Sequence, residues 1–223
     1  MNGVLNVLKP VGITSFDVIR QVRKTSDQRK IGHLGTLDPI AGGVLPLFLG
    51  KMTKLIPHFN LSDKSYRVEA RFGASSTTLD AEGELTPVAI PHSCTPELIE
   101  RTLLRFLGEG EQLPPMYSAV KVRGKKLYEY ARKGEAVERK PRRIEIHSIS
   151  NIDCRLPVLT FDISCSKGTY IRTLVNDLGE KVGCGAYLSG LMRTKCGPYF
   201  TLENAVPLEQ IKNIILDIAA GNL

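Results

Sequence analysis

Several signals that would assign a chain of 223 residues to other classes of protein are missing from this sequence. The five cysteines form no C-x-x-C pair and no Cys/His cluster with zinc spacing, which argues against a disulfide framework and a zinc fold. No apolar run approaches the roughly 18 residues that a membrane span needs. The N-terminus lacks a basic region and is interrupted by Lys9-Pro10, so it is not a signal peptide. We therefore expect a cytoplasmic protein with reduced, mostly buried thiols and no membrane association.

Motifs that hold cofactors or activate nucleophiles are absent as well. The sequence contains no Walker loop, no dinucleotide fingerprint and no Ser-His-Asp elbow. The four histidines do not have ligand spacing, so a metal site is rejected; His33 could still stack or hydrogen-bond in its loop. Any chemistry should therefore need neither a metal nor another cofactor.

Acidic residues are scarce where basic ones gather. The stretch Lys121–Arg143 holds ten basic and three acidic residues, which accounts for the whole net charge of +7. Tyr128 and Tyr130 lie within it, and this mixture of cations and aromatic rings suits a polyanion such as RNA. The alternative is the solvated surface of an amphipathic helix.

Hydrophobic periodicity indicates alternating strands and helices. We expect strands over Gly3–Leu8, Tyr66–Phe72, Ala119–Val122, Arg143–Ile149, Val158–Cys165 and Tyr187–Arg193. Helices are predicted over Lys51–His58, Lys125–Arg132 and Leu208–Ala219. Three more helices are predicted from a start signal and a buried face. The first begins at a cap, Thr14 or Ser15, and has Phe16, Ile19 and Val22 as its apolar face; the second follows the cap Thr95 and buries Ile99, Leu103 and Phe106; the third follows Gly168 and buries Ile171, Leu174, Val175 and Leu178. Residues 25–39 are expected to be loop and Ala74–Gly83 a polar turn region. Since no repeat or linker is evident, residues 1–223 are expected to form a single mixed α/β domain.

Asp38 is the only carboxylate between Gln28 and Ser62, so it has no acidic neighbour in sequence with which to form a dyad. Asp38-Pro39 is a pair that starts turns, because the Asp side chain accepts a backbone N–H and Pro fixes the next φ. Glycines at positions 32, 35, 42 and 43 let backbone or ligand approach closely on both sides of the acid. Asp38 therefore either forms a turn or performs chemistry by itself.

Arg172 lies in the first turn of a predicted helix, where the macrodipole opposes a cation by about 0.3–1 kcal/mol. A buried carboxylate is the natural partner, since the guanidinium fork binds it in two places and keeps it ionised. The alternative is an arginine that reaches solvent. Tyr66 and Tyr170 open a strand and a helix respectively, and such rings either stack on a nucleobase or pack in the core.

Four segments, in this order along the chain, resemble the motifs of the TruB-type tRNA pseudouridine synthases. They are residues 5–15 (LNVLKPVGITS), 32–46 (GHLGTLDPIAGGVLP), 114–119 (PPMYSA) and 165–173 (CSKGTYIRT), and the resemblance covers nearly everything from Gly3 to about Pro198. It implies an α/β fold of the α+β type, in which a mixed, mainly antiparallel sheet is flanked by helices around a central active-site cleft. The synthase-like core would span about residues 3–198, followed by a C-terminal helix over 207–220.

The resemblance implies an isomerase that converts one uridine in the T-loop of tRNA, at position 55, to pseudouridine. Such an enzyme breaks the N-glycosidic bond and joins the ribose to C5 of the base, without a metal or redox cofactor. Asp38 would be the catalytic carboxylate, and it could attack either the ribose or the uracil ring.

The same motifs imply roles for five further residues. Tyr66 would stack on the flipped uracil and assist proton transfer, and Arg172 would pair with the catalytic Asp. Tyr170 and Leu191 would line the base pocket. His33 would occupy the space that the target nucleotide leaves in the T-loop.

A base inside a folded loop must be extruded before its glycosidic bond can be reached, at a cost of a few kcal/mol. Stacking on Tyr66 and phosphate contacts from Lys125, Lys126 and Arg132 could offset that cost. The expected partner is the T-loop and stem of tRNA, with no obligatory protein partner and a monomeric state.

The sequence departs from the family pattern at two places. Gly42 stands where the pattern usually has Thr, and the chain ends at Leu223 without the C-terminal PUA domain of many relatives. We expect weaker or more salt-sensitive tRNA affinity and the same reaction. Two other functions remain open: an RNA-binding or RNA-folding module without turnover, and a guide-RNA-dependent synthase within a larger particle.

Overall fold

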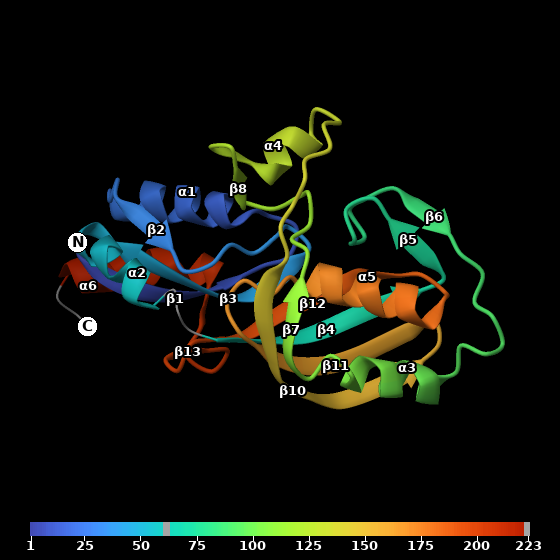
Figure 1. Cartoon of the computed structure of the whole chain (residues 1–223). Helices are drawn as coiled ribbons and strands as arrows, with labels where there is room; N and C mark the ends of the chain where they lie inside the picture. The colour runs from blue at the N-terminus through green and yellow to red at the C-terminus, as the bar shows by residue number, and fades with distance from the viewer. Residues whose placement is uncertain (60–62, 221–223) are drawn as a thin grey trace. The chain divides into compact units, whose positions relative to one another are not determined.

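The computed structural model describes residues 1–59 and 63–220 of the chain (Figure 1). It consists of two compact units: unit 1 comprises Met1–Tyr66 and Leu191–Leu223, and unit 2 comprises Arg67–Gly190. None of the helices in the described ranges is long and apolar enough to cross a membrane.

Unit 1 is built on β1 and β3, which pair in antiparallel register along the whole length of β1. The elements in chain order are β1 (Gly3–Lys9), α1 (Ser15–Ser26), β2 (Ile31–His33), β3 (Ala41–Leu49), η1 (Gly50–Leu55), α2 (Ile56–Phe59), the C-terminal part of β12 (Ala186–Cys196), β13 (Phe200–Thr201), β14 (Val206–Pro207), η2 (Leu208–Gln210) and α6 (Ile211–Ala220). β14 and β12 are parallel to their neighbours β1 and β3, and β2 is antiparallel to β3. The prediction of loop over residues 25–39 is wrong for β2, because three residues are too few to show a period.

β3 is the centre of the unit 1 core, since all nine of its residues are buried. It follows directly from the apolar sequence at Val44–Leu49, although the strand also contains Pro46. Pro46 has no N–H to donate, and its carbonyl accepts the N–H of Leu34 at 2.9 Å. The continuous apolar run therefore forms a strand that is covered on both faces, as such runs commonly do.

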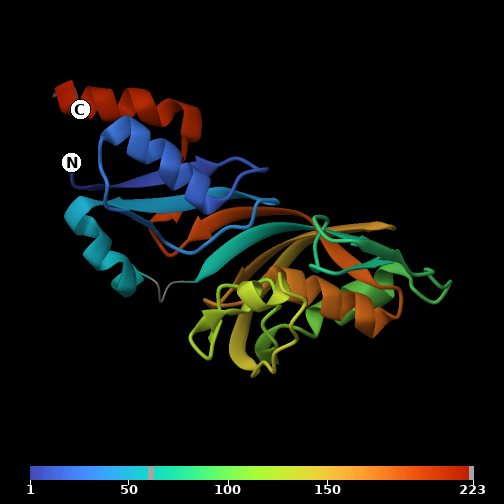
Figure 2. The same ribbon diagram turned by 90° about the horizontal axis from the view of Figure 1, so that it is seen from above.

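α1 begins as predicted, with Thr14 as N-cap and a reciprocal pair of hydrogen bonds to Asp17. Its buried face consists of Ser15, Val18, Ile19 and Val22. Phe16 was expected on this face and is exposed. The buried face is centred on Ser15, and the side chain of Phe16 points about a third of a turn away from it around the helix axis. Figure 2 shows α1 beside α6, in agreement with the contacts between the two helices.

Unit 2 contains four strands of the main sheet in the order β4, β11, β10, β7. Their bounds are Lys64–Phe72, Val158–Cys165, Arg142–Arg155 and Gly108–Gln112. β10 is antiparallel to both of its neighbours, and β4 alternates between buried and exposed residues as the sequence predicts. The sheet strands β4 and β12 each begin in one unit and end in the other.

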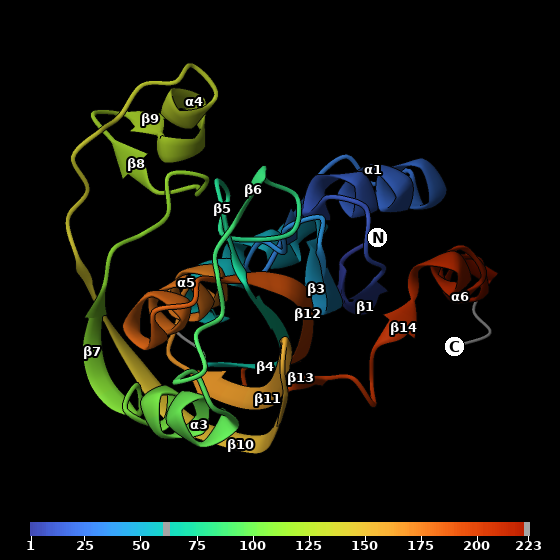
Figure 3. The same ribbon diagram turned by 90° about the vertical axis from the view of Figure 1, so that its right-hand side faces the viewer.

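Two helices of unit 2, α3 (Pro96–Leu104) and α5 (Ile171–Val182), contact each other, and α3 also contacts β10 (Figure 3). α3 has the predicted cap Thr95 and Pro at its first position. α5 buries the predicted apolar stripe together with Arg172. The molecule therefore has the predicted class: mixed α/β, with a mainly antiparallel sheet flanked by helices.

The remaining elements of unit 2 are small. β5 (Ala74–Ser76) pairs with β6 (Leu85–Pro87), and β8 (Lys121–Val122) pairs with β9 (Lys125–Lys126), which leads into α4 (Leu127–Ala131). The expected helix over Lys125–Arg132 is shorter than predicted. Arg123 and Gly124 adopt positive φ and form a tight hairpin turn, which places the next two lysines in a strand.

Candidate active site

Asp38 lies in a turn immediately before the buried strand β3. The N–H of Ala41 donates to the carbonyl of Asp38 at 3.0 Å, so Asp38-Pro39-Ile40-Ala41 is a hydrogen-bonded β-turn. The side chain of Asp38 is half-buried. The turn-forming interpretation of Asp38 is confirmed for its backbone.

Hydrogen bonds from the N-terminal segment hold the loop that carries Asp38. The buried Ser15 hydroxyl donates to the carbonyl of Leu37 at 2.9 Å and accepts its N–H at 2.8 Å. The N–H of Gly12 donates to the carbonyl of Pro39 at 2.8 Å. Both residues next to Asp38 in sequence are thus fixed, which restricts the position of its carboxylate.

A buried arginine holds the other end of the same loop. Arg193, on β12, is only 1% exposed. Its Nε donates to the carbonyl of Val44 at 2.7 Å, and its Nη2 donates to the carbonyl of Gly35 at 3.1 Å. Sequence reasoning missed Arg193, because its position in an alternating strand gives no sign that a charged side chain is buried there.

Lys9 is a second buried cation at the same end of β3. It is 1% exposed, and its Nζ donates to the carbonyls of Ala41 at 2.6 Å and Pro10 at 2.9 Å. In the sequence, Lys9-Pro10 interrupts the N-terminal apolar segment and lies within the first segment that resembles the family motifs, but Lys9 was given no role of its own. The position of Lys9 just before the turn at Gly12 is the signal that could have marked this lysine as part of the site.

Two glycines allow β3 to lie close to its neighbours. Gly43 has φ +103°, and a Cβ built there would be 2.2 Å from the carbonyl oxygen of Arg193. At Gly42 a Cβ would be 3.3 Å from atoms of Lys9, Val11 and Met192, so a larger residue would require its neighbours to move. The departure from the family pattern at Gly42 therefore coincides with tight local packing.

Three further predicted site residues belong to unit 1. Leu191 is half-buried on β12, directly opposite Ala41 in the parallel register. Tyr66 is buried on β4. His33 is half-buried at the end of β2, and burial, followed by the positive charge of Arg193, lowers the pKa of its imidazole. His33 is therefore neutral at neutral pH.

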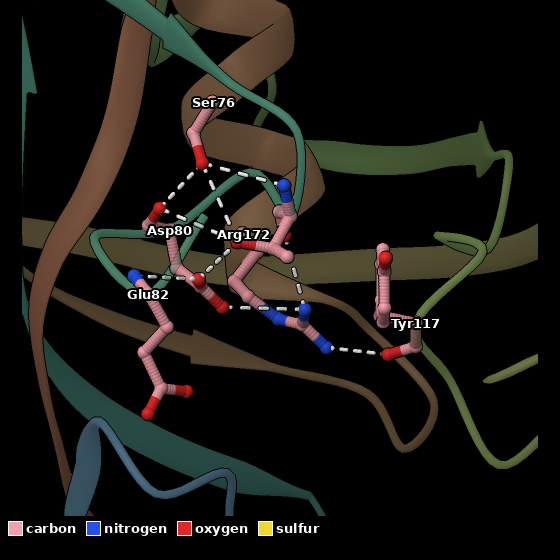
Figure 4. Close-up of polar contacts among 6 residues, drawn as sticks. Ser76, Asp80, Glu82, Tyr117 and Arg172 are labelled. Atoms are coloured by element: carbon pink, nitrogen blue, oxygen red, sulfur yellow. Dashed lines mark hydrogen bonds and ion pairs between the residues drawn. The ribbon is translucent and has the colours of Figure 1, made fainter. Parts of the chain in front are cut away.

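Arg172 occupies the first turn of α5 in unit 2, with its side chain buried. Its Nη1 lies 3.3 Å from Oδ2 of Asp80, and the two side chains are 6% and 3% exposed (Figure 4). The guanidinium also donates to the carbonyls of Thr78 at 3.1 Å and Tyr117 at 2.9 Å. The expectation of a buried carboxylate beside Arg172 is confirmed with Asp80 in this role, and the pair with Asp38 stays a prediction.

Asp80 is held as firmly as its partner. Its Oδ1 accepts the N–H of Glu82 at 3.1 Å and the hydroxyl of Thr78. The hydroxyl of Ser76 donates to the backbone carbonyl of Asp80 (Figure 4). Asp80 also forms an isolated β-bridge with Leu188. The connection between β5 and β6 is thus folded around one carboxylate that faces Arg172.

Tyr170 is the N-cap residue of α5 and is half-buried. The side-chain amide of the buried Gln112 accepts the N–H of Tyr170 at 2.7 Å and donates to its carbonyl at 3.0 Å. These two bonds link the end of β7 to the start of α5. They fix the backbone from which Tyr170 and Arg172 project.

Two of the three predicted phosphate-binding residues lie beside the ring of Tyr128. Lys126 and Arg132 place their charges 5.4 Å from the centre of its ring, and Lys125 and Arg132 are exposed. α4 itself contains no Lys or Arg. The alternative of a basic amphipathic helix is therefore wrong, because the cations lie in the hairpin and in the segment after the helix.

Within the described ranges, no group of three or more His, Cys, Asp or Glu side chains could hold a metal ion.

Two family models together match residues 23–220 of the chain. Residues 23–171 match the family model described as the TruB family pseudouridylate synthase N-terminal domain. Residues 172–220 match the C-terminal domain model of tRNA pseudouridylate synthase B. The fold, the site and these matches define the class: the chain is a pseudouridine synthase, an isomerase.

Curated relatives agree with the family models. The chain is 48% identical over 213 residues to tRNA pseudouridine synthase B of Cupriavidus metallidurans, covering 95% of this chain and 67% of the relative. It is 46% identical over 211 residues to the enzyme of the same name from Clostridium acetobutylicum, covering 95% and 72%. The chain belongs to the TruB family of tRNA pseudouridine synthases.

Solved structures confirm the predicted fold. In the crystal structure of a Cbf5-Nop10-Gar1 complex, a chain 28% identical superimposes with a TM-score of 0.75, over 99% of this chain and 56% of that one. A chain in the structure of an H/ACA RNP bound to a substrate RNA containing 2'-deoxyuridine is 24% identical, with a TM-score of 0.70 over 99% and 56%, and it shows the fold alone. This chain thus spans about half of each of those longer chains.

Proposed function

We propose that this chain converts the uridine at position 55, in the T-loop of cytoplasmic tRNA, to pseudouridine. Relatives named tRNA pseudouridine synthase B are 46–48% identical and match across 95% of the chain, which supports this substrate. The reaction breaks the bond between N1 of uracil and C1′ of ribose and forms one between C5 and C1′; C5 releases its hydrogen as a proton, and N1 takes up a proton. Units 1 and 2 together form one catalytic domain, since β4 and β12 contribute residues to both.

The observation that carries the proposal is the fixed turn of Asp38. Its neighbours are bound by Ser15 and Gly12, and the loop before it is bound by Arg193. Such multiple anchoring is typical of a group that must meet a reacting atom within a fraction of an ångström. Asp38 acts as the catalytic carboxylate, by attack on either the ribose or the uracil ring.

The target base leaves the T-loop and binds between aromatic and apolar side chains. Tyr66 stacks on the uracil, and Tyr170 and Leu191 line the pocket. His33 fills the place of the extruded nucleotide, and its lowered pKa supports this role because a neutral imidazole enters a base stack without a desolvated charge.

Arg172 pairs with Asp38 and keeps it ionised. The contacts of Arg172 with Asp80, Thr78 and Tyr117 support this role, because they fix the direction of the guanidinium. Its planar fork of donors can serve more than one carboxylate.

The tRNA partner is bound through its T-loop and stem by a monomer that needs no obligatory protein partner. Lys125, Lys126 and Arg132 provide phosphate contacts beside Tyr128. Replacing all three with Gln should flatten the dependence of log Kd on log salt by up to about three units. An unchanged slope would show that the RNA phosphates are bound by another part of the surface.

The decisive experiment compares the wild type with Asp38→Asn on a T-arm stem-loop RNA. Conversion is followed by the release of tritium from [5-³H]uridine and by mapping of the modified position, and binding is followed by filter retention. We expect Asp38→Asn to lose at least about three orders of magnitude in rate while its Kd changes little. Asp27→Asn, an exposed acid in the same unit, is the matched control and should keep the wild-type rate.

Two results would contradict the proposal. A wild-type protein that binds the stem-loop without converting it would support the RNA-binding module instead. An Asp38→Asn variant with the wild-type rate would remove the carboxylate from the mechanism.

A further inference from the structure

One face of α1 carries an exposed aromatic ring between two arginines. Phe16 is 53% exposed, and the guanidinium carbons of Arg20 and Arg23 lie 5.5 Å and 5.6 Å from its ring centroid. Spacings of four and seven residues place all three side chains on the same face of a helix. We call Phe16, Arg20 and Arg23 the α1 platform.

The two arginines of the platform differ in their partners. Arg20 forms an exposed salt bridge with Asp17 at 3.0 Å. The Nε of Arg23, in contrast, is buried and has no hydrogen-bond partner in the described part of the chain. A buried donor without a partner destabilises the free protein, and an acceptor that approached this guanidinium would relieve that cost.

The same helix is joined to the loop of Asp38. Ser15, which precedes Phe16, makes two hydrogen bonds with Leu37, which precedes Asp38. The buried contact between Ser15 and Leu37 therefore lies one residue before Phe16 on one side and one residue before Asp38 on the other.

We propose that the α1 platform is a further binding site for the substrate RNA, where an unpaired base stacks on Phe16 and backbone phosphates bind Arg20 and Arg23. This site rests on the proposed function, because it assigns the same RNA to a second surface of unit 1. Aromatic faces stack on any base, and guanidinium groups pair with phosphate oxygens in two places.

The charge around the platform also suits RNA. Lys24, Arg29 and Lys30 are exposed at or after the end of α1, and Asp27 is the only exposed acid among residues 24–30. Exposed cations beside a stackable ring form the combination that single-stranded nucleic acids recognise.

The test uses the full chain and the T-arm stem-loop RNA, with Kd measured between low and high salt and with KM and kcat measured separately. Arg20→Gln/Arg23→Gln should weaken binding and reduce the salt slope by up to about two units. The matched control is Lys51→Gln/Lys54→Gln, which removes two exposed charges from η1 of the same unit and should leave both quantities unchanged.

A second variant tests stacking. Phe16→Ala should raise KM at least about fivefold with little change in kcat, and Phe16→Trp should restore the wild-type KM. Because Phe16 is exposed, the melting temperature of both variants should match that of the wild type.

The outcomes separate this site from the proposed function. If the wild type converts the RNA and both the arginine and the Phe16 variants keep wild-type Kd, KM and salt slope, the α1 platform is overturned and the reaction stands. If the wild type fails to convert the RNA, the proposed function is overturned. A KM that Phe16→Trp does not restore would also contradict stacking.

Discussion

Replacing Asp80 with Asn tests whether the buried ion pair of unit 2 organises the start of α5. The substitution keeps the shape of the side chain and changes only its charge and one acceptor. Asp80 accepts from Glu82 and Thr78 on one oxygen and faces Arg172 at 3.3 Å with the other. An Asn amide must point its NH₂ group at either the guanidinium or the N–H of Glu82, and both orientations set a donor against a donor.

The expected loss of stability follows from burial. Both partners are almost fully excluded from water, with exposed fractions of 6% and 3%, so Asp80→Asn removes a buried negative charge that faces the guanidinium of Arg172. Removing one partner of such a pair costs about 3–5 kcal/mol in the free energy of unfolding. The guanidinium should also lose its fixed direction, so we expect kcat on the T-arm RNA to fall together with stability.

Urea unfolding followed by circular dichroism measures the first effect. The control is Asp162→Asn, which breaks the pair of Asp162 with Arg67, where the side chains are 26% and 68% exposed. A surface pair of this kind contributes less than about 1 kcal/mol. If Asp80→Asn destabilises the protein no more than Asp162→Asn does, the buried pair does not organise this region and the reasoning is refuted.

Two further predictions concern the backbone and the thiols. Gly43→Ala should lower the free energy of unfolding by about 2–5 kcal/mol, since its Cβ would be 2.2 Å from the carbonyl oxygen of Arg193 at φ +103°; Gly3→Ala, which meets nothing within 4 Å, is the control, and equal urea midpoints would contradict the packing argument. Burial raises the pKa of the Cys184 thiol to about 12, so iodoacetamide should not label this thiol in the native protein at pH 8. The free energy of unfolding should also fall as the pH rises from about 9 towards 12, because the thiol loses its proton at a lower pH in the unfolded chain than in the folded protein. Rapid native labelling of Cys184, located by peptide mapping, would show that the thiol is not shielded.

The elements that sequence alone predicted well are those with a strong period. β4 and β11 alternate between apolar and polar residues, and α5 carries a continuous apolar stripe. Each of these patterns reports directly which face is buried, so the element and its orientation could both be inferred.

β7 could not be predicted in this way. Its sequence, GEGEQ, has four exposed residues, and the strand exists because its backbone pairs with β10. Long-range pairing of this kind has no counterpart in local composition. β10 likewise continues beyond its predicted end at Ile149, through an irregularity in register between Ser150 and Asp153, to Arg155.

The partner of Arg172 shows the same limit within the site. The position of a cation in the first turn of a helix indicated a buried carboxylate, and this part of the argument needed no structure. Nothing in the turn region Ala74–Gly83 distinguishes Asp80 from the neighbouring Glu82, because the difference arises only when α5 packs against that turn. The chemistry of the partner was therefore predictable, and its identity was not.

The order in which the ribosome makes this chain has a consequence for the loop of Asp38. Unit 2 is a continuous insertion, complete at Gly190, whereas unit 1 needs both ends of the chain. Arg193, which anchors the loop, is added 155 residues after Asp38. At a synthesis rate of about 5–20 residues per second, Arg193 is added roughly 8–30 s after Asp38. During synthesis, unit 2 is the first part of the enzyme that can fold, and the catalytic loop is completed only when the strand of Arg193 emerges.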